Sequence, residues 1–419
     1  MISVEKALAI VLRSTPRLPH ESVEFEQSLG RVLSEDVVSD VDLPPFPRSA
    51  VDGFALRACD LERLPARLAV LAVVPAGVLP SFRIGPSECA QVMTGAPVPE
   101  GADAVQMVEK TREAGPGQVE VLEAVENGQN LAPRGSELKA GDTVLRSGTR
   151  VDPAGLAVLA TVGKTRVLVG GRPRVAVAAT GNELVDPSEK PGPARIRNSN
   201  GFAVSAQARQ AGAEVTYLGV AADDEVALSE VVRRGLAGDV LLLTGGVSMG
   251  KYDLVEEILR RFEIDILIDA VALKPGKPLV FGKAPGDQLV FGLPGNPVSS
   301  AVTFELFVRP ALGRMQGEER ASRPELQATL IAPLVSKGRR RAYLPGWVAP
   351  DTAGGRLLAR PVPTRGSADV VAFAKANALL ILPEEIDRLE SGAEVAVFLL
   401  DNFFYKEDRW APAREERGI

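Results

Sequence analysis

A glycine-rich segment near the middle of the chain has the residue types that bind phosphate. Residues 243–250 read LTGGVSMG and lead to Asp253, directly after an apolar run typical of a buried strand. Gly245 and Gly246 let the backbone turn sharply and expose its amide groups. Such loops at the carboxyl ends of strands bind phosphate through amides and helix dipoles. The alternative is a plain strand-to-helix connection with Asp253 as its cap.

Two lysines flank a second turn, which reads LKPGKP over residues 273–278. Pro275 and Gly276 suit the two central positions of a type II turn, which would hold Lys274 and Lys277 close together. Two neighbouring ammonium groups repel each other, so an anion between them is the natural compensation. An exposed hairpin with incidental lysines is the alternative.

A third turn, GLPGNP at residues 292–297, precedes an apolar helical pattern. Asn296 is a good helix cap and Pro297 fits the first helical turn, while Pro294 and Gly295 make the bend. This arrangement predicts another exposed helix N-terminus that can hold an anion.

Carboxylates follow several of the predicted strands. Glu183 comes after the segment ATGN, and Asp223 and Asp224 follow a strand that ends near residue 220. Together with Asp253, these acids are expected at the same sheet edge as the lysines, because parallel strands end at one edge. Acids mixed with lysines suit a phosphate ester with a bridging Mg²⁺. Taken singly, each acid is better explained as a cap or surface residue, and it is their coincidence at one edge that favours a site.

Two further loops lie outside this region and are unusually specific in sequence. Residues 46–55 read FPRSAVDGFA, with Asp52 before a glycine, and residues 93–103 read MTGAPVPEGAD, with Thr94. A simple turn is the strong structural alternative for the Asp52 segment.

The elements that must position these residues alternate between strand and helix in the central third of the chain. Continuous apolar runs predict strands buried on both faces, and the segments between them have helical periodicity. This alternation predicts an open, mostly parallel α/β domain. The predicted strands are residues 175–179, 215–220 and 240–243, and the predicted helices are residues 201–211, 225–234, 254–262 and 298–312.

The flanking regions have a different character. Residues 1–14 form an amphipathic helical pattern, and a second helix begins at Asp152 and Pro153. Both helices lie outside a β-rich segment at residues 68–122, so we expect them to pack together as a split domain. Residues 326–400 return to β character.

Composition excludes several classes of function. The 419 residues predict two to four domains, and a net charge of −6 argues against a large nucleic-acid interface. With only Cys59, Cys89 and His20, neither a disulfide framework nor a histidine-based catalytic site is expected. No apolar run reaches membrane-spanning length, so the cytoplasm is the expected compartment.

The motifs, taken in order, resemble the molybdopterin molybdenumtransferase family, which includes bacterial MoeA and the E domain of gephyrin. The resemblance spans nearly the whole chain, and eight short motifs in the right order make coincidence improbable. The motifs are residues 49–55, 93–96, 101–103, 179–184, 198–200, 244–250 with Asp253, 274–278 and 293–297.

The resemblance implies a multidomain α/β plus β fold and a homodimer. The active-site cleft would lie between the α/β domain of one subunit and the inserted domain of the other. The implied domains are an elongated split dimerisation domain (1–42 and 141–171), an inserted β-rich domain (43–140), an α/β molybdopterin-binding domain (172–318), a C-terminal β-barrel-like domain (319–402) and a tail (403–419).

The implied reaction inserts molybdenum from molybdate into adenylylated molybdopterin and releases AMP, with a divalent cation such as Mg²⁺. The substrate's dithiolate supplies the sulfur ligands, so the protein's task is positioning and electrostatics. The implied catalytic residues are Asp52, Thr94, Glu183, Asp223, Asp253, Lys274 and Lys277, of which Glu183, Asp223 and Asp253 would hold the metal. The implied substrate-binding residues are Arg134, Thr180, Ser199, Asn200, Gly245, Gly246, Ser248, Pro294, Gly295, Asn296, Pro297 and Ser367.

The chain departs from the family pattern at Ala132, Asn198 and Pro345, which puts peripheral contacts in doubt more than the centre. Two other functions stay open. One is the adenylyltransferase that makes the adenylylated intermediate, although that family has TGGTG where this chain has TGGVS. The other is a non-catalytic molybdopterin-binding scaffold. The resemblance also implies transient contacts with the adenylyltransferase and with molybdoenzymes.

Overall fold

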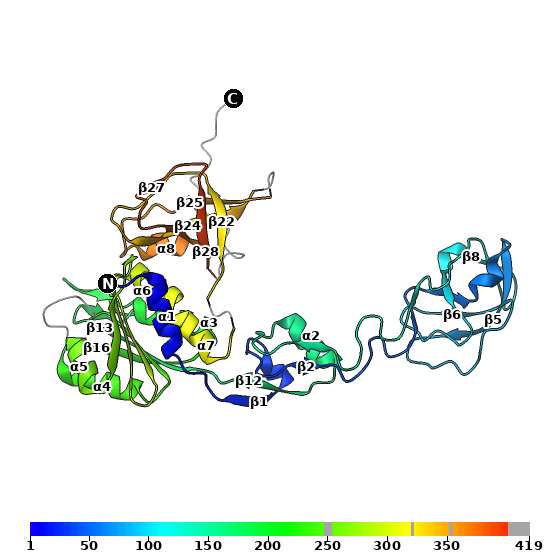
Figure 1. Cartoon of the computed structure of the whole chain (residues 1–419), viewed down its shortest axis with the longest axis horizontal. Helices are drawn as coiled ribbons and strands as arrows, with labels where there is room; N and C mark the ends of the chain where they lie inside the picture. Colours follow the sequence, from blue (N-terminus) through cyan, green and yellow to red (C-terminus); the bar gives the residue numbers. More distant parts are fainter. Residues whose placement is uncertain (247–253, 320–321, 352–354, 401–419) are drawn as a thin grey trace, which may run out of the picture.

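The computed structural model describes residues 1–246, 254–319, 322–351 and 355–400. The chain forms an elongated molecule (Figure 1). An α/β unit and a small barrel lie next to each other at one end, a thin two-stranded ribbon leads away from them, and a separate β lobe forms the far end.

The α/β unit is built on a six-stranded sheet in the order β16-β13-β17-β21-β20-β18. Neighbours among the first four strands are parallel, and the last two add as antiparallel strands. This confirms the predicted open, mostly parallel α/β sheet. The strands are β13 (Arg174–Thr180), β16 (Glu214–Ala221), β17 (Val240–Thr244), β18 (Asp265–Ala270), β20 (Pro278–Lys283) and β21 (Leu289–Leu293).

Helices cover both faces of this sheet, which explains its continuously apolar strands. On β17, Val240 and Leu242 face one core, and Leu241 and Leu243 face the other. α4 (Glu225–Gly235) and α5 (Leu254–Arg261) cover the second core. The first core lies under α3 (Asn200–Gln210), α6 (Pro297–Thr303), a π-helical turn (Phe304–Val308) and α7 (Arg309–Met315).

The N-terminal helix α1 (Val4–Ser14) does not pack as predicted. It buries Val4, Ala7 and Val11 in the core of the α/β unit, against α7 and the π-helical turn. The helix at residues 152–163, α2 (Pro153–Thr161), belongs to a different core around β12. The expected pairing of these two helices is therefore wrong, because an apolar stripe shows that a helix is buried but does not select the surface that buries it.

The ribbon brings together segments from both sides of the insertion. β1 (His20–Glu24) pairs antiparallel with β12 (Arg166–Gly170), and β2 (Val37–Val38) pairs with β11 (Thr143–Leu145). The start of α2 is as predicted, because Asp152 accepts a hydrogen bond from the amide of Gly155 at 2.7 Å. The limits of the split domain stay a prediction.

The distal lobe contains a six-stranded sheet in the order β7-β4-β6-β5-β9-β8. β3 (Arg48–Ser49) pairs with β10 (Leu131–Ala132) where the chain enters and leaves the lobe. The sheet strands are β4 (Gly53–Leu56), β5 (Ala66–Val74), β6 (Glu88–Val92), β7 (Ala104–Met107), β8 (Thr111–Glu113) and β9 (Gln118–Val121), with short 3₁₀ turns at Ala58–Leu61 and Val108–Lys110.

The C-terminal unit is a five-stranded barrel, closed by pairing between β24 and β26. β19 (Leu273–Lys274) pairs with β24 and so joins the lysine-bearing turn to this barrel. The barrel strands are β22 (Glu325–Leu330), β24 (Arg341–Pro350), β25 (Leu357–Pro361), β26 (Ala378–Leu382) and β28 (Glu394–Leu399). Nearby lie α8 (Val370–Lys375), β23 (Leu334–Val335) and β27 (Arg388–Leu389). None of the helices in the described ranges is both long and apolar enough to span a membrane.

Candidate functional site

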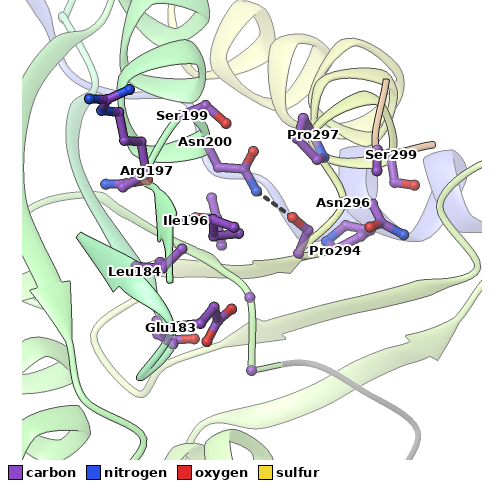
Figure 2. A pocket seen from close by; sticks show the side chains of 18 of the residues that line it. Glu183, Leu184, Ile196, Arg197, Ser199, Asn200, Pro294, Asn296, Pro297 and Ser299 are labelled. Atoms are coloured by element: carbon purple, nitrogen blue, oxygen red, sulfur yellow. Dashed lines mark hydrogen bonds between the residues drawn. The ribbon is translucent and has the colours of Figure 1, made fainter. Parts of the chain in front are cut away.

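A pocket of about 660 Å³ opens at the carboxyl edge of the central sheet, where β13, β17 and β21 end (Figure 2). It brings together eleven of the residues predicted from the sequence: Thr180, Glu183, Ser199, Asn200, Asp223, Gly245, Gly246, Pro294, Gly295, Asn296 and Pro297. The sequence reasoning missed Leu184, Ile196, Arg197, Pro278, Ser299 and Ala368, which also line it. Of these, Ser299 had a detectable signal, because it lies in the first turn of the predicted helix after Pro297.

The two glycines of the TGG segment are required by close packing. A Cβ at Gly245 would lie 2.4 Å from the carbonyl oxygen of Thr180, and one at Gly246 would lie 2.6 Å from Thr180 Oγ1. Both glycines also have positive φ, at 91° and 67°. The amide of Gly245 donates to the carbonyl of Leu293 at 3.1 Å. This amide is therefore not free for a ligand, and Gly245 shapes the loop instead.

Glu183 and Asp223 supply the negative charge of the pocket. The backbone amide of Asn182 donates to Asp223 Oδ2 at 3.3 Å, and the Asp223 amide donates to Asn182 Oδ1 at 3.2 Å. This reciprocal pair connects the loops after β13 and β16. The adjacent Asp224 has a different task, because it accepts hydrogen bonds from two amides and caps α4.

Asp253 and Ser248, the other predicted residues of this region, lie outside the described residues. Within the described ranges, no group of three or more acidic, cysteine or histidine side chains could hold a metal ion. The two carboxylates at one pocket are nevertheless hard oxygen donors of the kind that Mg²⁺ prefers. They fit such a cation as part of a ligand set that the substrate or Asp253 would complete.

The loop before α3 is organised by Asn198, at the position where the resemblance leads one to expect an aspartate. Asn198 Oδ1 accepts from the amide of Gly201 at 3.1 Å, and its Nδ2 donates to the hydroxyl of Tyr217 at 2.6 Å. An aspartate could not make this second bond as a donor. Burial raises the pKa of Tyr217, so its hydroxyl stays neutral. The next residues therefore enter the pocket from a fixed loop, and Asn200 Nδ2 donates to the carbonyl of Gly295 at 2.7 Å (Figure 2).

Asn296 occupies the predicted cap position of α6, but its side chain does not cap the helix. Asn296 Nδ2 donates instead to Ser367 Oγ at 3.0 Å, and the carbonyl of Ser367 accepts from the Val298 amide at 3.0 Å. The predicted capping role is thus wrong for the Asn296 side chain, because a residue distant in sequence serves the end of the helix. Ser367, which was predicted from the resemblance alone, lies where the barrel meets the pocket.

The two lysines line a second cavity of about 340 Å³, which shares Pro278, Asn296 and Ser299 with the first pocket. Arg340, Thr364 and Ser367 also line this second cavity, which we call the cationic cavity. Lys274 Nζ donates to the carbonyl of Lys337 at 2.7 Å, and Arg340 Nη1 donates to that of Leu273 at 3.1 Å.

The turn that carries the lysines has glycine where a positive φ is needed, since Gly276 has a φ of 114°. A positive φ at this position agrees with the predicted turn. The Lys274–Pro275 peptide is cis, and the type II assignment stays a prediction. Lys274 and Lys277 nevertheless line the same cavity.

Asp52 and Thr94 do pair with each other, but far from both cavities of their own chain. The amide and the hydroxyl of Thr94 donate to Asp52 Oδ1 at 2.6 and 3.0 Å. Both residues belong to the distal lobe, which extends away from the α/β unit (Figure 1). Arg134 forms a salt bridge with Asp42 at 2.7 Å, near the entry to that lobe. None of these three residues lines the pocket in its own chain.

The fold and the pocket define a class of protein: an α/β ligand-binding unit with a barrel beside it and a long arm that carries a β lobe. The models of three protein regions match the chain in the same order. They are the MoeA N-terminal region (domains I and II) at residues 2–163, a probable molybdopterin-binding domain at residues 176–314, and the MoeA C-terminal region (domain IV) at residues 327–400.

Relatives match the chain over nearly its full length. A molybdopterin molybdenumtransferase of Bacillus subtilis is 37% identical over 407 residues, which are 95% of this chain and 94% of the relative. One of Staphylococcus epidermidis is 34% identical over 412 residues, or 97% of each chain. The chain therefore belongs to the molybdopterin molybdenumtransferase (MoeA) family.

Solved structures agree with this assignment. Two structures of a molybdopterin biosynthesis MoeA protein from Pyrococcus horikoshii superpose with TM-scores of 0.76 and 0.80, at 34% and 30% identity. They cover 95% and 96% of this chain, and 99% and 100% of their own. The multidomain α/β plus β fold predicted from the sequence is confirmed.

Proposed function

We propose that the chain inserts molybdenum from molybdate into adenylylated molybdopterin and releases AMP. The observation that carries the proposal is the adjacency of two unlike sites. A pocket with two carboxylates, Glu183 and Asp223, shares three lining residues with a cavity that has three basic side chains. The carboxylates suit a divalent cation that assists cleavage of a phosphoanhydride, and the basic side chains suit a tetrahedral oxyanion. The proposed reaction needs these two environments next to each other.

The first pocket suits the adenylylated pterin. Glu183 and Asp223 would repel a phosphoanhydride unless a divalent cation stood between them, so we assign them to a cation such as Mg²⁺, with Asp253 as a further candidate ligand. When bound, the cation would neutralise charge on the phosphoanhydride. The residues of the TGG segment and the 294–297 loop form the walls that position the substrate.

The cationic cavity suits molybdate. Lys277 and Arg340 bring positive charge, and Thr364 and Ser367 bring hydroxyl groups that can donate to oxyanion oxygens. Lys274 adds charge, although one of its donor positions is taken by the carbonyl of Lys337. The sulfur ligands of the metal come from the substrate, which fits a chain with two cysteines, neither of which lines either cavity.

Asp52 and Thr94 would act from a second copy of the chain. Their distance from their own pocket in an arm-like lobe supports a homodimer in which the lobe of one subunit reaches the pocket of the other. Such a shared site would be formed twice by two-fold symmetry. Arg134 would then keep the base of the arm in place through Asp42.

The cellular setting follows from the reaction. The substrate must come from an adenylyltransferase and the product must pass to molybdoenzymes, so we propose transient contacts with both. The cytoplasm is the proposed compartment. We expect no nucleic-acid partner, because a net charge of −6 argues against a large nucleic-acid interface.

The direct test supplies the purified protein with adenylylated molybdopterin, Mg²⁺ and molybdate, and measures AMP release. We expect release that requires molybdate. If the protein instead forms an AMP adduct from molybdopterin and ATP without molybdate, the adenylyltransferase alternative is correct. Tight binding of the pterin without any turnover would favour the scaffold alternative.

A further inference from the structure

The loop that leads into β24 carries two cationic side chains besides the one that lines the cationic cavity. Residues 337–341 read KGRRR, in a chain whose net charge is −6. Arg340 lines the cavity, and Arg341 is neutralised by salt bridges to two glutamates. Lys337 and Arg339 are exposed, and no hydrogen bond or ion pair joins their side chains to another described residue. These two charges therefore lack a partner within the described part of the chain.

The loop is held against the cavity at more than one point. Lys274 Nζ, in the cavity wall, donates to the carbonyl of Lys337 at 2.7 Å. The amide of Arg340 donates to the carbonyl of Gly338 at 2.7 Å, and Gly338 has a φ of 106°, so the loop turns sharply here. Consecutive Cα atoms are only about 3.8 Å apart, so Arg339 also lies next to a wall residue. We call Lys337 and Arg339 the basic rim of the cavity.

The two acids bonded to the neighbouring loops do not cancel this positive charge. Asp387 Oδ1 accepts from the amide of Gly338 at 3.3 Å, which places one negative charge at the rim. Asp369 accepts from the amide of Arg365 at 3.0 Å and offsets the charge of that arginine, whose two neighbours line the cavity. The basic rim and the three basic side chains of the wall outnumber these acids, so the mouth of the cavity is positive.

Charge at the rim acts on an anion before the anion reaches the cavity. The interaction of two charges falls only with the inverse of their distance, and at low ionic strength it extends over about 30 Å. Clefts lined by one sign of charge raise the local concentration of ions of the opposite sign. The neighbouring pocket has negative charge from Glu183 and Asp223, so it repels the same anion. A dianion is therefore drawn to one of two adjacent sites.

We propose that the basic rim draws molybdate to the cationic cavity and raises its affinity by long-range charge, without contact to the bound anion. The inference rests on the proposed function, which assigns this cavity to molybdate. A tetrahedral dianion is the fitting class of ligand, because Lys337 and Arg339 supply charge but stand outside the residues that would bond its oxygens. Tungstate has the same charge and shape, so the rim should raise its affinity equally.

The test measures molybdate binding to the full chain by equilibrium dialysis at two ionic strengths. Lys337→Gln or Arg339→Gln should raise the Kd for molybdate about threefold at about 0.01 M, as expected for a dianion about 10 Å from one charge in water. The double variant should raise it about eightfold. At about 1 M the screening length is about 3 Å, so both effects should vanish. A variant that distorts the cavity would instead bind molybdate weakly at both ionic strengths.

Matched variants separate the rim from the net charge. Lys139→Gln combined with Arg146→Gln removes one lysine and one arginine from exposed positions in the arm, between β10 and α2. It lowers the net charge as much as the double rim variant but should leave the Kd for molybdate unchanged. Arg339→Lys keeps the charge and should retain the affinity. Arg365→Gln should weaken molybdate less than Arg339→Gln, because Asp369 already offsets that charge.

An unchanged Kd in the double rim variant at low ionic strength would overturn the proposal. A loss that persists at high ionic strength would also overturn it, as would no molybdate binding by the unaltered chain. Molybdate-dependent AMP release is measured in parallel. If release persists while the double variant binds molybdate normally, only the role of the rim is wrong. If the double variant loses affinity as expected but the unaltered chain releases no AMP, the proposed function fails and the rim stands.

Discussion

Asn296 and Ser367 lie in different units of the fold, and a 3.0 Å hydrogen bond from Asn296 Nδ2 to Ser367 Oγ joins them. The same serine caps α6 through its carbonyl group, which accepts from the amide of Val298. The barrel is therefore part of the site's construction, because it supplies both a helix cap and a wall of the cationic cavity.

Loss of the Ser367 hydroxyl should affect molybdate use more than folding. Ser367→Ala removes the bond to Asn296 but keeps the capping carbonyl, so we expect destabilisation of only about 1 kcal/mol. The KM for molybdate should rise severalfold, and Ser367→Thr should restore it. Ser22→Ala, on the distant strand β1, is the control for steady-state kinetics and urea unfolding. An unchanged molybdate KM in Ser367→Ala would remove this hydroxyl from the anion site.

Gly245 should not tolerate a side chain. In Gly245→Ala the new methyl group would lie 2.4 Å from the Thr180 carbonyl oxygen, so the loop or β13 must move. Gly128→Ala is the matched control, because Gly128 also has positive φ, at 80°, but no atom lies within 4 Å of the added methyl group. Gly245→Ala should therefore lose about 2 kcal/mol more unfolding free energy than the control, measured by denaturant titration. Equal losses would mean that the backbone conformation alone determines the need for glycine.

Asp223 should matter for the reaction, and Asp224 should not. Asp223→Asn keeps an oxygen for the Asn182 amide but removes the charge, so we expect kcat/KM for molybdate-dependent AMP release to fall about a hundredfold. Asp224→Asn keeps a side chain that can cap α4 and should retain near-normal activity. Titration of the Mg²⁺ requirement checks the cause, since only Asp223→Asn should need more cation. Similar losses in both variants would contradict the assignment.

Mixed dimers test whether the arm acts on the partner subunit. Asp52→Ala and Asp223→Asn should each lose nearly all activity when refolded alone. When the two variants are refolded together in equal amounts, half of the dimers should contain one subunit of each kind. Each of these mixed dimers holds one intact site out of two. Activity should therefore return to about a quarter of the unaltered level. Two copies of the same variant, treated identically, are the control. No recovery in a demonstrated mixed dimer would exclude a site shared in this way.

The two cysteines should differ in reactivity. Burial raises the pKa of Cys89 to about 12, whereas Cys59 is exposed. One thiol should therefore react with a disulfide reagent in the native protein at pH 8, and two after unfolding. The unfolded thiol ionises near pH 9, so Cys89 should favour unfolding progressively as the pH rises from about 9 to 12. Cys89→Ala should reduce this alkaline loss of stability, and rapid native reaction of both thiols would contradict the buried state.

The amino-acid sequence by itself determined the local structure and the position of the main pocket. Continuous apolar runs predicted strands covered on both faces, and Asp152 with Pro153 marked the start of α2 correctly. Parallel strands end at one edge, so Glu183, Asp223 and the TGG glycines could be expected to meet. These inferences succeeded because capping, periodicity and strand direction depend on residues close in sequence.

Only the tertiary structure decided which distant surfaces meet. It placed α1 in the α/β core. It also made the carbonyl of Ser367 the group that caps α6, and the carbonyl of Leu293 the acceptor for the Gly245 amide. Among the described residues, it also left Gln207 Oε1 without a hydrogen-bond partner. The physical reason is that hydrophobic burial has no direction and a polar group accepts any partner of correct geometry. Each local pattern is compatible with many packing and hydrogen-bond partners, and the fold of the whole chain determines which of them lie close enough to interact.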